Sequence, residues 1–247
     1  MIVSRGILPI RATLLAGVAL LVSTASPRAE PPPRPSGRQT WDALAELWTS
    51  GVNLAKPPGF PEIGKWMLAP DGGAAHWLGE VYEGKRLQEP INVILVVEGD
   101  GAGDATRRVL DASAAAGYPV RFGHSAGYRG SVGGRLYGQL PRGRDDAFSN
   151  GPFEFSNNHG RIFGPHKLGE TFVFVAAFSR EAVDPFRWPG HRFASFNAAR
   201  DDFTQKLDRA TPFKIGGFVS LDNALVDDPA VTTGDHDGLA VLVRAAK

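Results

Sequence analysis

The chain has 247 residues, no cysteine and a formal net charge of +1 at neutral pH. The lack of cysteine excludes disulfides, thiolate catalysis and cysteine-ligated zinc. The near-neutral charge lacks the basic excess of a nucleic-acid binder, so no nucleic-acid partner is expected. The length suits one domain, whose hydrophobic core must stabilise the fold without disulfides.

The first residues have the pattern of an export signal. Arg5 and Arg11 precede the apolar run Leu14–Val22, and small residues follow up to Ala25. The run is shorter than the roughly 20 residues that a membrane helix needs. We therefore expect residues 1–25 to be a signal peptide, the mature protein to be periplasmic or secreted, and no membrane span after signal removal.

Two segments are predicted between this signal and the main domain. Residues 26–39 are rich in proline and polar side chains, which is typical of an extended linker. Residues 40–89 are expected to form an N-terminal extension that wraps the domain surface. A short helix from Thr40 to Trp48 is predicted at the start of this extension, because Trp41, Leu44 and Trp48 recur at helical spacing.

The regular core is predicted to begin with a strand, a helix and a second strand. Ile91–Val97 is almost entirely apolar, which is typical of a strand buried on both faces. Asp104–Ala116 is rich in alanine and is expected to be a helix capped by Asp104 and closed by Gly117. Tyr118–Phe122 then returns as a short strand, which gives a βαβ-like unit.

The rest of the core adds one strong strand and one strong helix. Thr171–Phe178 is an apolar strand, and Ser195–Arg209 is a helix whose apolar side chains, including Phe196 and Phe203, share one face. Shorter strands are expected at residues 136–140, within 146–155, at 213–221 and at 239–243. The sequence therefore predicts an α+β fold in which two main helices pack on a mixed β-sheet and long glycine-rich loops connect the elements.

A polar run from Asn157 to His166 is the first candidate site. In an extended strand, Asn157, His159 and Arg161 would lie on one face because side chains alternate. An imidazole and a guanidinium on one face can hold a phosphate or carboxylate, with His159 moving protons and Asn157 and Arg161 binding the ligand. The alternative is that these side chains satisfy backbone groups where the strand begins.

The second candidate site is the triplet Asp235, His236 and Asp237, in which two carboxylates flank one imidazole. These groups could hold a divalent metal, or an aspartate could orient His236 as a general base. Equally, the surrounding threonine, aspartate and glycine residues are typical of a turn.

Two further residues near the second helix are candidates. His191 lies just before this helix and is a candidate catalytic residue. Arg200 borders the helix's apolar face, where an unpaired charge is unfavourable. Arg200 is therefore either a ligand-binding residue or a member of a structural ion pair with Asp201, Asp202 or an acid on a strand.

Residues Gly123–Gly127 match the G-x-S-x-G pattern, with Ser125 as an alternative nucleophile. In α/β-hydrolases this pattern lies at a sharp turn between a strand and a helix. The glycine-rich residues that follow, up to Gly134, cannot form a stable helix. A glycine-rich turn that contains the pattern by coincidence is therefore the favoured interpretation.

The chain from about residue 90 to residue 247 resembles the LssY C-terminal domain family of bacterial envelope proteins. The resemblance rests on short motifs in a consistent order: Pro90–Val93, Ala116–Tyr118, Leu140–Phe148, His159–Phe163, Phe172–Arg180, His191, Arg200–Asp201 and Asp237–Gly238. It implies the fold of that family, a location in the cell envelope and a functional interest in His159, Arg161, His191 and Arg200.

These observations lead to three hypotheses about function. The first is an ester or phosphoester hydrolase whose pocket is formed by His159, Arg161, His191 and the Asp235–Asp237 triplet. This pocket would bind a small anionic ligand and could also hold a divalent metal. The second is a non-catalytic binding module for anionic lipid headgroups or a partner protein. The third is a serine esterase that uses Ser125.

Overall fold

The computed structural model describes residues 53–122, 127–144, 146–186 and 190–246. The predicted signal peptide, linker and Thr40–Trp48 helix lie outside this range. The described residues belong to one compact unit. Among them, no helix is both long and apolar enough to cross a membrane.

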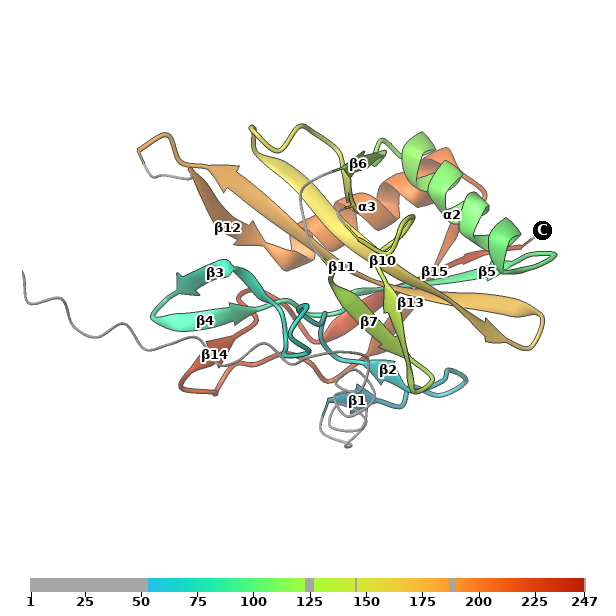
Figure 1. The fold of residues 1–247 in the computed structure, drawn as a ribbon, viewed down its shortest axis with the longest axis horizontal. Coiled ribbons are helices and arrows are strands. Elements are labelled where there is room, and N and C mark those ends of the chain that lie inside the picture. The colour runs from blue at the N-terminus through green and yellow to red at the C-terminus, as the bar shows by residue number, and fades with distance from the viewer. Residues whose placement is uncertain (1–52, 123–126, 145, 187–189, 247) are drawn as a thin grey trace, which may run out of the picture. The chain divides into compact units, whose positions relative to one another are not determined.

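The fold is organised around a long mixed β-sheet (Figure 1). Its strands follow the order β13, β15, β5, β11, β10, β9 and β6, and β12 also pairs with β11. All neighbours in this sheet are antiparallel except β15 and β5, which are parallel. The strands are β5 (Val93–Glu98), β6 (Val120–Phe122), β9 (Asp146–Ser149), β10 (Asn157–Leu168), β11 (Thr171–Val183), β12 (His191–Ser195), β13 (Lys214–Ser220) and β15 (Leu239–Ala245).

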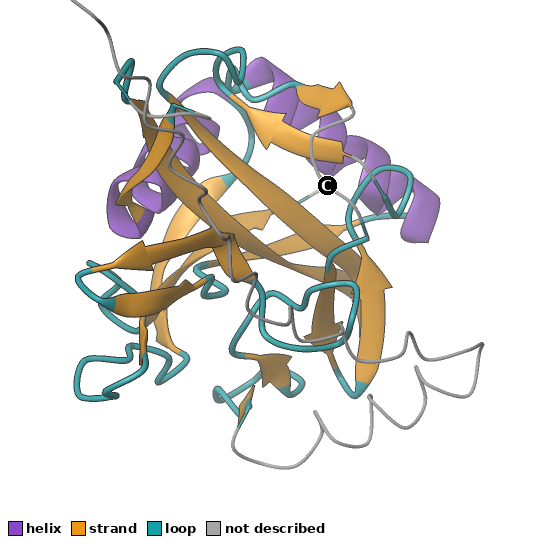
Figure 2. Cartoon of the chain, turned by 60° about the vertical axis from the view of Figure 1, so that its left-hand side comes forward, coloured by secondary structure: helices purple, strands orange, loops and turns teal. Residues whose placement is uncertain are grey.

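Two helices cover one face of this sheet, as Figures 1 and 2 show. They are α2 (Ala102–Ala115) and α3 (Phe196–Ala210). Ser195 caps α3 by accepting a hydrogen bond from the backbone of Ala198, and Gly117 adopts a φ of 81° just after α2, a conformation that glycine tolerates. The apolar side chains of both helices pack onto alternate residues of the strands.

The opposite face of the long sheet is covered by two small sheets. One contains β1 (Leu54–Ala55), β2 (Ile63–Gly64), β7 (Arg129–Val132) and β8 (Arg135–Gly138), and the other contains β3 (His76–Tyr82), β4 (Lys85–Gln88) and β14 (Val231–Thr232). Because both faces of the long sheet are covered, the fold has a hydrophobic core on each face, and strand β5 contributes to both. Val93, Leu95 and Val97 join the helical core, whereas Ile94 and Val96 face the small sheets.

The predicted α+β fold, with two helices on a mixed sheet, is confirmed. The strand, helix and strand of the predicted βαβ-like unit are present as β5, α2 and β6, but β11, β10 and β9 lie between the two strands in the sheet. The predicted cap of α2 is wrong: the N-cap is Gly101, and Asp104 lies in the first turn. Residues 53–89, predicted as an extension, supply β1–β4 of the small sheets.

Candidate functional site

The strands β10 and β11 place a row of polar side chains on the face that the small sheets cover. Their antiparallel register sets Asn157 opposite Glu181 and His159 opposite Ser179. Asn157, His159 and Arg161 share this face, as their alternation predicted. All five side chains are buried, so each polar atom needs a partner within the protein.

His159 lies within a chain of hydrogen bonds. Trp77 Nε1 donates to Ser179 Oγ over 3.1 Å, and Ser179 Oγ lies 3.3 Å from His159 Nε2. His159 Nδ1 lies 3.2 Å from Asn157 Oδ1. Ser179 Oγ and Asn157 Oδ1 thereby contact the two ring nitrogens of His159. The chain holds the ring in one orientation.

Glu181 lies at the centre of this face, between the two histidines. Its Oε1 accepts a hydrogen bond from Asn157 Nδ2 and lies 3.9 Å from His159 Nδ1. Its Oε2 lies 3.4 Å from Nδ1 of His191, whose side chain is 23% exposed. Burial raises the pKa of Glu181 above its ordinary value, although Asn157, His191 and Arg161 each oppose this shift. The carboxyl of Glu181 therefore ionises at a higher pH than that of an ordinary glutamate.

On the helical face of the same strands, Asn158 connects a second polar cluster. Asn158 Oδ1 accepts a hydrogen bond of 2.7 Å from Arg180 Nε. Asn158 Nδ2 donates to Asp202 Oδ2 over 3.0 Å and to the hydroxyl of Tyr118 over 3.1 Å. Asn158 on β10 thereby holds two side chains in fixed relative positions, Arg180 from β11 and Asp202 from α3.

Asp202 is held as an anion in this cluster. Its Oδ2 accepts hydrogen bonds from Tyr118, Asn158 and Lys206, the last over 2.8 Å. These donors lower the pKa of Asp202 despite the opposing effect of burial. Within the described part of the chain, no hydrogen bond reaches its other oxygen, Oδ1.

The two clusters meet at one small cavity of about 240 Å³. Every residue that lines it is polar, and Glu181 and Asp202 are both among them. The lining consists of Asn150, Ser156, Asn157, Asn158, Arg180, Glu181 and Asp202. A cavity that is lined by polar residues, two of which have perturbed carboxyl pKa values, is a candidate functional site.

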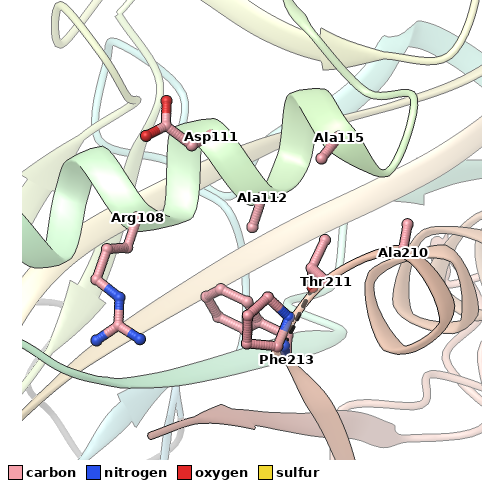
Figure 3. A pocket seen from close by; sticks show the side chains of 8 residues that line it. Arg108, Asp111, Ala112, Ala115, Ala210, Thr211 and Phe213 are labelled. Atoms are coloured by element: carbon pink, nitrogen blue, oxygen red, sulfur yellow. Dashed lines mark hydrogen bonds between the residues drawn. The ribbon is translucent and has the colours of Figure 1, made fainter. Parts of the chain in front are cut away.

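A second cavity, of about 280 Å³, has a different character. Figure 3 shows that its walls come from α2, the end of α3 and the residues that follow, with the Phe213 ring at its centre. Apart from Arg108, Asp111 and Thr211, the lining is alanine, proline and phenylalanine. The guanidinium of Arg108 already donates to the backbone oxygens of Glu98 and Ala246. Asp111 is the one acid in the described lining, so this cavity lacks the two acids of the first.

Arg161 does not line the polar cavity, contrary to its predicted role in holding an anion. Its Nη1 lies 3.5 Å from Glu89 Oε2, and its guanidinium lies over the Tyr128 ring, 4.5 Å from the centroid. Glu89 is completely buried, and burial raises its pKa. The arrangement is a buried ion pair, which accounts for Arg161 without a ligand.

Arg200 forms structural ion pairs, which is the second of the two roles expected for it. Its guanidinium binds both carboxylate oxygens of Asp237, over 2.7 and 3.1 Å, and donates to Asp201 Oδ1 over 2.8 Å. It also donates to the backbone oxygen of Leu239. The alternative interpretation, a structural ion pair that includes Asp201, is therefore confirmed.

Each residue of the predicted metal triplet Asp235–Asp237 has a structural partner of its own. Their geometry therefore does not support a shared metal. Asp235 accepts from Ser195 and from the backbone of Phe196 at the start of α3, and Asp237 pairs with Arg200. His236 Nε2 lies 2.8 Å from Asn223 Oδ1. Across the described ranges, no group of three or more acids and histidines is placed to hold a metal.

The expected convergence of three histidines is therefore only partly right. His159 and His191 meet around Glu181, whereas His236 has a different partner and neither lines the cavity nor shares a residue with them. Ser125 lies outside the described residues, and the segment after it forms the strand β7 rather than a helix, as expected.

Sequence reasoning missed Ser179, Arg180, Glu181 and Asp202. The apolar run of β11 ends at Phe178, so the predicted strand stopped there, but the strand continues to Val183. The sequence does contain evidence for a longer strand. In the run Ser179–Glu181, polar residues follow the buried strand with no glycine or proline between them that would end it. Asp202 carries no local signal, because only the packing of α3 against β10 and β11 brings it to the cavity.

Comparisons of the chain with protein-family models, with curated proteins and with solved structures found no match. The resemblance to the LssY C-terminal domain family stays a prediction. The geometry of the polar cavity is therefore the basis for a proposed function.

Proposed function

We propose that the protein is a hydrolase of small esters or phosphoesters, with Glu181 and Asp202 as its acid and base. One observation carries this proposal. Glu181 and Asp202 both line one cavity of about 240 Å³, and their environments move the pKa values of their carboxyl groups in opposite directions. Carboxyl groups with separated pKa values allow one site to supply an acid and a base at the same pH.

Glu181 is suited to the role of general acid. Burial favours its protonated form, and a protonated carboxyl can donate to the leaving oxygen of a substrate. Asp202 is suited to the role of general base, because it stays ionised and its Oδ1 is open to a water molecule.

The proposed reaction transfers two protons. Asp202 takes a proton from water as the water oxygen bonds to the carbonyl carbon or phosphorus atom. The bond to the leaving oxygen breaks, and that oxygen takes the proton of Glu181. The proton on Asp202 must then return to Glu181. His191, which is partly exposed beside Glu181 Oε2, is placed to pass protons between Glu181 and solvent.

The test is a hydrolysis assay on purified protein with p-nitrophenyl acetate and p-nitrophenyl phosphate. Glu181→Gln and Asp202→Asn should each lower kcat/KM by about 10²- to 10⁴-fold, the usual contribution of an acid or base. Glu154→Gln is the matched control, because Glu154 is exposed and lies outside the cavity. Unchanged rates in both cavity variants would contradict the proposal.

A binding module without turnover is the second candidate function. It is favoured by the rigidity of the cavity, since Asn157 and Asn158 use both of their amide protons within the protein. Such preorganisation favours binding as much as catalysis. A ligand that binds in the cavity but is recovered unchanged would support this candidate. The predicted signal peptide would place either function in the cell envelope.

A further inference from the structure

We propose, resting on the hydrolase function above, that Arg180 anchors an oxyanion and that the substrate carries a phosphate group. Arg180 lies on β11 next to Glu181 and lines the polar cavity. The predicted anion-binding role thereby moves from Arg161, which has a buried acidic partner, to a guanidinium that opens onto the cavity.

Arg180 differs from the other arginines that are fixed in the fold. Arg142 pairs with Asp146, Arg161 with Glu89 and Arg200 with Asp237. Among the described residues, the hydrogen bond from Nε to Asn158 is the only one that the Arg180 side chain makes, and this side chain forms no ion pair. The N–H groups of Nη1 and Nη2 are therefore available to a ligand. Their planar arrangement can bind phosphate or carboxylate through two parallel hydrogen bonds.

Two neighbours supply further donors to the same cavity. Asn150 Oδ1 accepts from the backbone of Asn158 over 2.8 Å, which orients the amide and leaves its Nδ2 without a partner in the described chain. Ser156 Oγ accepts from the backbone of Val183 over 2.9 Å, so its own proton stays free to donate. Donors on three residues suit the three terminal oxygens of a phosphate better than the two of a carboxylate.

The charges around the cavity favour the same ligand. Lys206 Nζ lies 2.8 Å from Asp202 Oδ2 and compensates that carboxylate. Arg180 is the only basic residue in the described lining of the cavity and forms no ion pair with a described residue, so a phosphate would supply its counter-charge. A soluble phosphate ester and a lipid headgroup offer this same chemistry.

Calorimetric titration with inorganic phosphate tests the anchor directly. We expect the protein to bind phosphate with a Kd of about 1 mM or tighter. Arg180→Gln should weaken binding at least tenfold, and Arg180→Lys should bind with intermediate affinity because it keeps the charge but not the fork. Arg144→Gln is the matched control, since Arg144 is exposed and outside the cavity. Equal binding by Arg180→Gln and the unmodified protein, or no binding by the unmodified protein, would overturn the proposal.

Two further ligands separate the sources of the phosphate. Glycerol 3-phosphate represents a soluble ester, and phosphatidylcholine vesicles containing phosphatidic acid represent a lipid headgroup. Loss of binding in Arg180→Gln for either ligand supports the anchor and identifies its source. Phosphate binding without hydrolysis would contradict the hydrolase alone. Hydrolysis of p-nitrophenyl acetate by a protein that binds no phosphate would contradict the anchor alone.

Discussion

Glu181 lies directly opposite Asn157 in the pairing of β11 with β10, and it accepts a hydrogen bond from the side-chain amide of that residue. The same amide donates to the backbone oxygen of Phe155, so both of its protons are used. This contact fixes the carboxyl of Glu181 beside the cavity. Burial then raises its pKa, and Asp202 on the helical side keeps its charge.

Replacing His191 should change the acidity of Glu181. His191 Nδ1 lies 3.4 Å from Glu181 Oε2, and this contact lowers the pKa of Glu181. In His191→Gln this attraction is lost, so the pKa of Glu181 should rise further. The pH profile of kcat/KM checks this, because its alkaline limb should move to higher pH. The prediction fails if the limb stays in place or moves to lower pH.

Ser179→Ala should keep most of the activity. The Ser179 hydroxyl is buried, accepts from Trp77 and contacts His159, so a substrate does not reach it. Its removal should lower the free energy of unfolding by about 1 kcal/mol, the usual net contribution of a buried hydrogen bond. Urea unfolding and the hydrolysis assay measure both effects. A loss of activity by more than about 10³-fold would instead identify Ser179 as a nucleophile.

The stability of the fold should decrease in acid because of His236. Burial lowers the pKa of His236 from 6.5 to about 4 in the folded protein. Its contribution is therefore fully present above pH 6.5 and is lost as the pH falls towards 4, because the unfolded chain binds the proton more readily. This shift corresponds to about 3 kcal/mol at most.

Urea unfolding at several pH values tests this role. His236→Gln should unfold with a weaker pH dependence between pH 6.5 and 4 than the unmodified protein, since the amide does not titrate. The pH dependence of unfolding should also be measured for His76→Gln, because burial lowers the pKa of His76 as well. Identical pH dependence in His236→Gln and the unmodified protein would rule out His236 as the source.

Arg200→Met should destabilise the protein by about 1.5–3 kcal/mol, the usual contribution of hydrogen bonds to charged groups, because Asp237 loses its bidentate partner and the bond to the Leu239 backbone is also lost. Asp201→Asn should have a smaller effect, since the Asp201 side chain is 42% exposed. Urea unfolding measures both. A loss of less than about 1 kcal/mol in Arg200→Met would show that the ion pair is not structural.

The sequence predicted the elements with strong hydrophobic periodicity. The β5 strand, both helices and the closing strands β13 and β15 have apolar residues at strand or helical spacing and lie close to their expected positions. The strand order was not predictable in the same way. Three strands between β5 and β6 are inserted by pairings between distant segments, and no local pattern encodes that choice.

The candidate site was predictable only where alternation along one strand decides the geometry. The shared face of Asn157, His159 and Arg161 follows from β10 alone. Their partners come from other elements, and those partners decide their roles. Glu89 makes Arg161 structural, whereas Asn158 leaves most of Arg180 open to the cavity.

The most direct test of the proposed acid and base is a carbon-13 NMR titration of the Glu181 and Asp202 carboxyl groups. Glu181→Gln and Asp202→Asn assign the two signals. We predict that Glu181 titrates above its ordinary pKa of 4.5 and Asp202 below its ordinary 3.8. If Glu181 titrates at or below 4.5, or Asp202 titrates above Glu181, the site cannot hold the acid and base assigned to it.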